Sequence, residues 1–153
     1  MKIKKLLICL AIPLAVGGLS ALLSGGMETY ATLIKPPLSP PGWLFPVVWT
    51  ALFLLMGYAS YRVLTADAPE ADKRRALTVY GAQLVLNFLW SPVFFGLGWL
   101  TVAFLILVAL WIMILITGNL FSQIDKTAGT LLLPYLLWVT FAGYLNFAFI
   151  LLN

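Results

Sequence analysis

Long apolar stretches, each about 20 residues in length, alternate with short polar segments along this chain. The apolar stretches cover residues 6–24, 44–64, 77–96, 100–121 and 129–150. The hydrocarbon core of a bilayer is about 30 Å thick, and a helix needs roughly 20 apolar residues to cross it. The pattern therefore predicts an all-α integral membrane protein, a single domain over residues 1–153 built as a bundle of five transmembrane helices.

The first apolar stretch has two interpretations, because the Lys-rich start "MKIKK" also resembles the beginning of a secretory signal peptide. Such peptides have an apolar core of roughly 7–15 residues followed by a small-residue cleavage site. The run from Leu6 to Leu23 is longer, and no A-x-A site follows at the expected place. We therefore predict that this segment is retained as the first span.

Composition and charge agree with a membrane protein. The chain is 63% hydrophobic and 9% charged, whereas soluble domains are about 45–50% apolar and about 25% charged. With the N-terminus inside, the outer segments hold only Lys35 among the nine Lys and Arg residues. The other eight lie on the inner side: Lys2, Lys4, Lys5, Arg62, Lys73, Arg74, Arg75 and Lys126. Because positive residues favour the cytoplasmic side, we predict a cytoplasmic N-terminus and an outer C-terminus in a bacterial cell membrane, surrounded by lipid and without a nucleic-acid partner.

Several chemistries are excluded by the residues that the sequence lacks. It has no histidine, and Cys9 is its one cysteine, so histidine-ligated metal, imidazole catalysis and an internal disulfide are ruled out. We expect no metal site and no required cofactor. The five spans also carry no Asp, Glu or Lys in the membrane core, which argues against a proton- or ion-coupled transporter.

The connecting segments differ in kind. Residues 65–76 are charged and predict a solvated loop, while residues 96–99 and 122–128 predict tight turns. Residues 25–43 form a long outer loop with four prolines in its second half, ending at Pro41. Proline-rich backbone is stiff, and loops of this length are usually functional or disordered. We therefore predict a lid over the outer mouth of the bundle.

Polar and aromatic residues inside the spans fall on shared helical faces. Spacings of three and four place residues on one side of a helix. The third span has Gln83, Asn87, Trp90 and Phe94 at these spacings, and the fifth has Tyr135, Trp138, Ala142 and Asn146. Trp49 lies about one turn below the outer loop. The predicted orientation brings these faces to middle and outer depth, which predicts an aromatic, uncharged chamber under the lid.

The asparagines and the proline within the third and fifth spans also have structural explanations. Asn87 and Asn146 could contact a ligand, or could form hydrogen bonds to neighbouring helices worth about 0.6–2 kcal/mol each. Pro92 cannot donate to the carbonyl of Phe88. We expect Pro92 to kink the third span, and Ser91 or a neighbouring helix to satisfy the freed carbonyl.

Three motifs carry a family resemblance. They are "KPPLSPPGWLFPVVWTALFLLMGYA" at 35–59, "QLVLNFLWSPVFFG" at 83–96 and "LLPYLLWVTFAGYLNFAFILLN" at 132–153. Together they resemble the TspO/translocator protein family, also called peripheral benzodiazepine receptor-like proteins. The resemblance runs over nearly the whole chain, in the same order and with the same number of helices.

The resemblance implies a five-helix bundle, commonly a homodimer, that binds porphyrins and related tetrapyrroles in a pocket closed by the first loop. Mapped by motif, it implicates five pocket residues most directly: Trp49, Asn87, Trp90, Trp138 and Ala142. Tyr30 and Pro41 in the loop, and Asn146 of "YLN", are secondary candidates. Cholesterol binding through the short Tyr motif of animal members is disfavoured, because no basic residue follows Tyr144.

The sequence leaves three functions open. The leading one is a membrane receptor or carrier for porphyrin-type tetrapyrroles, with a metal-free porphyrin such as protoporphyrin favoured over haem because no histidine can ligate iron. The second, which the resemblance implies, is an enzyme that degrades protoporphyrin in light, with Trp49 and Trp138 as the redox-active candidates. The third is a stress-regulatory membrane scaffold whose partner recognises residues 65–76.

Overall fold

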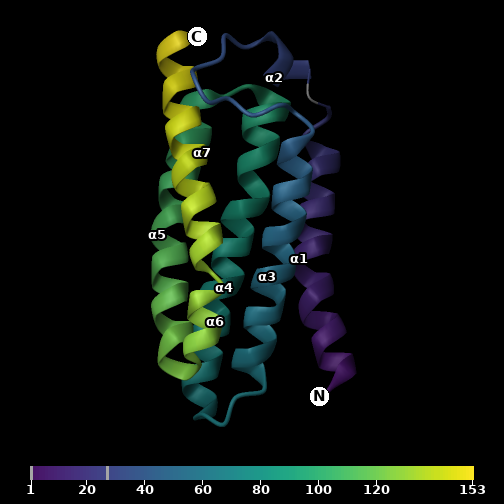
Figure 1. Cartoon of the computed structure of the whole chain (residues 1–153), viewed down its shortest axis with the longest axis vertical. Coiled ribbons are helices and arrows are strands. Elements are labelled where there is room, and N and C mark those ends of the chain that lie inside the picture. The colour runs from purple at the N-terminus through teal and green to yellow at the C-terminus, as the bar shows by residue number, and fades with distance from the viewer. Residues whose placement is uncertain (1, 27) are drawn as a thin grey trace.

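Five long helices form an elongated bundle with the two termini at opposite ends (Figure 1). The structure is a computed structural model that describes residues 2–26 and 28–153. The long helices are α1 (Ile3–Leu23), α3 (Leu44–Leu64), α4 (Glu70–Ser91), α5 (Leu100–Ile124) and α7 (Leu133–Leu152). Three short elements complete the described part of the chain: α2 (Glu28–Thr32), the π-helix η1 (Pro92–Leu97) and α6 (Lys126–Thr130).

Most of the packing in the bundle is between long helices that follow one another along the chain. Helix α1 packs against α3 and α4, and α5 packs between α4 and α7. Five helical segments in the described residues are long and apolar enough to cross a membrane: Ile3–Leu23, Leu44–Leu64, Glu70–Leu97, Leu100–Ile124 and Lys126–Leu152. The predicted five-helix membrane bundle is therefore confirmed.

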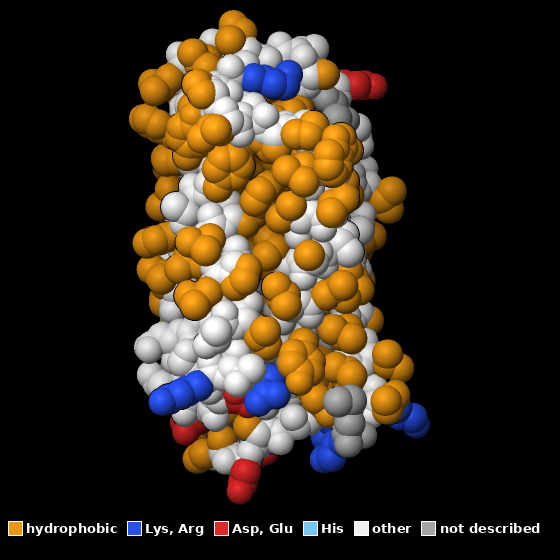
Figure 2. All heavy atoms as spheres, viewed as in Figure 1, with side chains coloured by type: hydrophobic (Ala, Val, Ile, Leu, Met, Phe, Trp, Pro, Cys, Tyr) orange, Lys and Arg blue, Asp and Glu red, His pale blue; other side chains and the backbone are white. Residues whose placement is uncertain are grey.

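The outer surface has the pattern of a membrane protein. Apolar side chains cover the middle of the molecule in Figure 2, and most Lys and Arg side chains visible there gather at the end that holds the N-terminus. Large apolar residues such as Leu22, Leu105 and Leu137 are exposed. Exposing this apolar surface to water would cost much free energy, whereas contact with the hydrocarbon tails of lipids does not.

The third span departs from a regular helix at Pro92, as predicted. Because Pro92 has no N–H, the α-helical ladder ends at Ser91 and a π-helix follows as far as Leu97. The Ser20 hydroxyl of α1 donates to the Phe88 carbonyl over 2.9 Å. A neighbouring helix thus satisfies the carbonyl that proline leaves free, and Ser91 instead lies 2.7 Å from the Ser24 hydroxyl.

The connections at the N-terminal end are more helical than the sequence predicted. The charged segment 65–76 is a loop only as far as Pro69, because Glu70 and Asp72 stabilise the first turn of α4. Between α5 and α7, the Asp125 carboxylate accepts the Ala128 N–H over 3.1 Å and caps α6. The same carboxylate pairs with the Arg62 Nε of α3 at 3.1 Å, which ties α6 to α3.

Candidate functional site

Three tryptophans from three helices meet beneath the outer loop. Trp49 of α3 has its ring centroid 6.3 Å from that of Trp90 in α4 and 6.5 Å from that of Trp138 in α7. Tyr135, one turn from Trp138, contacts Trp49 edge-on at 6.1 Å. The predicted aromatic faces therefore converge, because α3, α4 and α7 each turn the face that carries a tryptophan into the bundle.

A chain of hydrogen bonds connects the amides of α4 to α7. The Asn87 Nδ2 donates to the Tyr135 hydroxyl over 2.7 Å, and that hydroxyl donates in turn to the Gln83 Oε1. The Gln83 amide nitrogen lies 3.9 Å from the Met56 sulfur. All four residues are buried. In a membrane interior such a network stabilises the contact between helices, since no water is present to form these hydrogen bonds instead.

A second set of polar contacts centres on Asn146, which is completely buried. Its Oδ1 accepts the Trp90 indole N–H over 3.1 Å, and its Nδ2 donates to the Leu100 carbonyl over 2.9 Å. Leu100 is the first residue of α5, whose first carbonyls and amides lie near the lid end of the bundle. Asn87 and Asn146 therefore both take the structural role that the sequence allowed, pairing with neighbouring helices.

One polar atom in the cluster lacks a partner. The Trp138 indole N–H is buried and makes no hydrogen bond with any described residue. Its ring lies 6.0 Å from Phe45 and 5.5 Å from Phe141, which are both apolar. Because a buried donor without an acceptor costs about 1–3 kcal/mol, an acceptor atom added next to this N–H would remove that cost.

The outer loop covers the aromatic cluster and is itself partly helical. Tyr30 of α2 is 3% exposed and contacts Phe45, Phe95 and Phe149 edge-on. Its hydroxyl donates to the Pro40 carbonyl, which folds the loop back on itself. Burial raises the pKa of the Tyr30 hydroxyl above its ordinary value, so this donor stays protonated at neutral pH.

Helix α7 holds the loop closed through two residues. The Asn153 side chain donates to the Ile34 carbonyl over 3.1 Å and accepts the Ile34 N–H over 3.0 Å. The Tyr144 hydroxyl donates to the Pro37 carbonyl over 2.7 Å. We call these three contacts the lid clasp. They hold the predicted lid against the bundle. The roles of Tyr144 and Asn153 were not predicted, because an exposed Asn or Tyr has no sequence pattern that identifies a backbone partner.

The sequence-predicted site residues are brought together, with one exception. Gln83, Asn87, Trp90, Phe94, Tyr135, Ala142, Asn146 and Tyr30 are buried, and Trp49 and Trp138 are partly buried against them. Pro41 is different: its side chain is exposed, and its carbonyl accepts the Leu44 N–H at the start of α3. Pro41 is therefore exposed at the end of the lid, where α3 begins.

Three phenylalanines in the cluster were missed from the sequence. Phe45, Phe95 and Phe149 join Tyr30 to the tryptophans below it. Helical spacing could have found two of them, since Phe45 precedes Trp49 by four residues and Phe149 follows Asn146 by three. Phe95 lies in the π-helix, where the regular spacing of an α-helix no longer applies.

The aromatic cluster is closed in this structure. The cavity among Phe45, Trp90, Phe94, Ala142 and Asn146 has a volume of only about 10 Å³, which is room for one water molecule at most. Sites for drug-sized ligands have volumes of about 300–1,000 Å³. The predicted chamber therefore exists as a set of converging residues, and a ligand can enter only after the lid opens and the rings separate.

Comparisons with known proteins give a consistent picture. Residues 9–152 match the TspO/MBR family. The chain is 40% identical to the tryptophan-rich protein TspO of Chlorobaculum tepidum, over 99% of this chain and 98% of that protein. It is 41% identical to the tryptophan-rich sensory protein of Cereibacter sphaeroides over 82% of this chain and 77% of the relative. The translocator protein of Bos taurus is 39% identical over 80% of this chain and 73% of its own length.

Proposed function

Because the chain belongs to the TspO/MBR family, we propose that it is a membrane receptor or carrier for porphyrin-type tetrapyrroles, with protoporphyrin IX as the preferred ligand. The observation that carries the proposal is the unpartnered indole N–H of Trp138, buried among the rings of Trp49, Phe45 and Phe141. A flat macrocycle would offer the acceptor atom that this N–H lacks and a π-surface for the rings around it.

The aromatic rings would supply most of the affinity. A macrocycle inserted between Trp49, Trp90 and Trp138 would replace their mutual contacts at 6.3 and 6.5 Å with stacking on its own faces. Such contacts contribute about 0.5–1.5 kcal/mol each beyond area burial. The amides of Asn87 and Asn146 would orient the ligand once their present partners move aside.

The acidic groups of a porphyrin would lie at the lid. Lys35 is the only Lys or Arg between residues 6 and 61. Its ammonium lies 5.0 Å from the centre of the Tyr30 ring and makes one long contact of 3.4 Å with the Ala31 carbonyl. Neither contact neutralises its charge, so it remains available to a propionate. The proposed orientation places this lid on the outer side of a bacterial cell membrane and the Lys- and Arg-rich end in the cytoplasm.

A fluorescence titration tests the proposal. Protoporphyrin IX added to the detergent-purified protein should quench tryptophan emission with a saturable curve. Replacing Trp138→Phe together with Asn87→Ala should raise the half-saturation concentration by about tenfold or more, as expected for the loss of roughly 1.4 kcal/mol or more. Trp99→Phe is the matched control, because Trp99 is 57% exposed and lies just before the start of α5. Equal curves for the double variant and the parent would refute this site.

A light-dependent degradation of the bound porphyrin is the second candidate function. It is favoured by the contact distances between Trp49, Trp90 and Trp138, which place oxidisable indoles where the macrocycle would bind. Bound protoporphyrin illuminated in the presence of oxygen should lose its Soret absorbance faster than free protoporphyrin, and Trp49→Phe with Trp138→Phe should remove the difference. Loss at the rate of free porphyrin would reject catalysis and leave the binding function intact.

Other expectations remain proposals. We propose a homodimer, in keeping with the family resemblance. The scaffold hypothesis now concerns the loop 65–69 and the first turns of α4, where Lys73 and Arg75 pair with Glu70 and Asp72. Neutralising these charges without loss of porphyrin binding, and with loss of the cellular stress response, would favour that role.

A further inference from the structure

One residue of the lid has a backbone conformation that its side chain disfavours. Leu38 has a φ of +70°, in the left-handed region where the Cβ of an L-residue lies too close to the following carbonyl oxygen. Two other residues in the described part of the chain have positive φ, and both are glycines: Gly25 follows α1, and Gly98 follows η1. Leu38 is therefore the one described position where the chain takes this conformation without glycine.

The turn that contains Leu38 explains the unusual angle. Pro37 and Leu38 are the two central residues of this turn, and the Ser39 hydroxyl donates to the Pro36 carbonyl over 2.7 Å beside it. A proline at the first central position and a positive φ at the second form the pattern of a type II turn. The second position usually holds glycine or asparagine. The sequence "KPPLSPP" thus places a leucine where this turn favours glycine.

The turn is held in this shape from both sides. On the N-terminal side, the lid clasp fixes both backbone groups of Ile34 and the carbonyl of Pro37. On the C-terminal side, the Tyr30 hydroxyl donates to the Pro40 carbonyl. A strained residue persists only where its surroundings determine its conformation. The contacts that close the lid are therefore the contacts that hold Leu38 at positive φ.

The leucine side chain adds no packing that would offset the strain. Leu38 is 79% exposed, whereas Tyr30 and Leu33 of the same loop pack in or against the core. Leu38→Gly would keep the hydrogen bonds of the closed lid, which involve other residues, and would remove the steric conflict. The strain at Leu38 is thus a cost of the closed lid alone.

We propose that backbone strain at Leu38 sets the opening equilibrium of the lid. The closed lid holds this residue at positive φ, and an open lid, with the clasp broken, lets it return to a negative φ. The strain raises the free energy of the closed state and so increases the population of the open state. The inference rests on the proposed function for its consequence, because it names what controls entry of the ligand to the aromatic cluster. Opening itself is measurable without a ligand.

Hydrogen exchange at the Ile34 amide tests the proposal in the detergent-purified protein. This N–H donates to the Asn153 Oδ1 over 3.0 Å and exchanges when the clasp opens. Leu38→Gly should slow the exchange about threefold or more, because glycine is favoured over other residues at positive φ. Leu38→Asn should slow it by less, since asparagine tolerates the left-handed region. Leu38→Val should accelerate it, because β-branched residues fit that region worst.

Leu38→Ala is the matched control. It removes the exposed side chain but keeps the Cβ that causes the conflict, so its exchange rate should equal that of the parent. Equal slowing in Leu38→Ala and Leu38→Gly would overturn the proposal, because the side chain and not the backbone would then set the equilibrium. Faster exchange in Leu38→Gly than in the parent would also overturn it, since the closed lid would then not be strained at this residue.

A second measurement separates this inference from the proposed function. The association rate of protoporphyrin IX in stopped-flow fluorescence should fall in Leu38→Gly by about the same factor as the exchange rate, and stay at the parent value in Leu38→Ala. Exchange rates that follow the predicted series in a protein without saturable quenching would support the strain at Leu38 and refute the porphyrin site. Exchange unchanged by Leu38→Gly, with saturable quenching intact, would refute the strain and leave the porphyrin site standing.

Discussion

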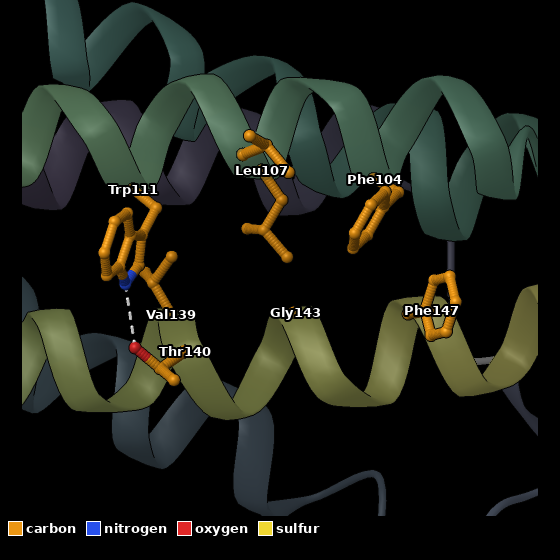
Figure 3. Close-up of a pocket in the computed structure, with 8 residues that line it drawn as sticks. Phe104, Leu107, Trp111, Val139, Thr140, Gly143 and Phe147 are labelled. Carbon is orange, nitrogen blue, oxygen red and sulfur yellow. Dashed lines mark hydrogen bonds between the residues drawn. The ribbon is translucent and has the colours of Figure 1, made fainter.

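Helix α7 has two contrasting faces, one turned into the bundle and one turned outward. The face with Tyr135, Trp138 and Asn146 turns into the bundle, where aromatic rings and amides converge but leave a cavity of only about 10 Å³. The face with Thr140 and Gly143 turns toward lipid and borders a hollow of about 280 Å³ between α5 and α7 (Figure 3). The inward face offers aromatic and amide groups but almost no free volume. The outward face offers free volume but no unbonded polar group.

This difference shows what binding requires at the inner face. A ligand of the inner face must first displace side chains that already satisfy one another, so binding depends on how often the closed cluster opens. The hollow on the outer face, by contrast, is already open. Specific, gated binding is therefore expected under the lid.

Adjacent residues give the strongest test of the comparison. Ala142→Leu adds three carbons where only about 10 Å³ is free, and such overpacking should lower the free energy of unfolding by about 1–3 kcal/mol. Gly143→Leu places the same side chain in open space and should leave stability unchanged or raise it by about 0.5–1 kcal/mol through helix propensity. Thermal unfolding in detergent measures both. Equal destabilisation by the two leucines would show that the hollow between α5 and α7 is closed in solution.

Removing one hydrogen bond on each face gives a smaller contrast. Tyr135→Phe leaves the Asn87 amide and the Gln83 carbonyl oxygen buried without a partner, which should cost about 1–3 kcal/mol of unfolding free energy. Trp111→Phe removes the outer bond but leaves Thr140 bonded to the Leu136 carbonyl, so its cost should be near 0.6 kcal/mol, an average value for such bonds in membranes. Chemical unfolding compares the two variants. A larger loss of unfolding free energy for Trp111→Phe would show that the hydrogen bond on the outward face contributes more to stability than the network around Tyr135.

Loosening the lid clasp tests whether the inner face is gated. Asn153→Ala removes both hydrogen bonds to Ile34 and should raise the rate of protoporphyrin association several-fold, because the lid then opens more often. Stopped-flow fluorescence measures this rate. In the parent, the association rate should level off at high porphyrin concentration, because opening then becomes limiting. A rate that rises linearly without limit would contradict gating.

The smallest effect concerns Asp125, which lies between α5 and α6 and away from both faces of α7. Burial raises the pKa of Asp125, but the Ala128 N–H and the Arg62 guanidinium outweigh it and hold that pKa below its ordinary 3.8. A carboxylate with a lowered pKa stabilises the fold above its unfolded value and loses that contribution as pH falls through the folded pKa. The melting temperature of the parent should therefore drop between about pH 5 and about pH 3 by more than that of Asp125→Asn. Parallel curves would show that the Arg62 pair adds nothing to stability.

The sequence predicted most of the inner face and little of the outer one. Spacings of three and four place Asn87, Trp90, Trp138 and Asn146 on inward faces, because buried polar and aromatic residues in a membrane helix stand out against an apolar background. The residues that line the hollow between α5 and α7 have no such pattern in the sequence. Trp111 and Gly143 look like ordinary lipid-facing residues, since the space between them depends on how far apart α5 and α7 lie.

The sequence by itself therefore determined the five spans, the inward faces of α4 and α7, the proline break at Pro92 and the presence of a lid, because hydrophobicity and helical period are local properties of the chain. Only the tertiary structure decided that the amides pair with one another, that Ser20 satisfies the Phe88 carbonyl, that Asn153 fastens the lid and that the open hollow lies on the lipid side. Each of these depends on distances between residues far apart in sequence, and those are set by the joint packing of all five helices.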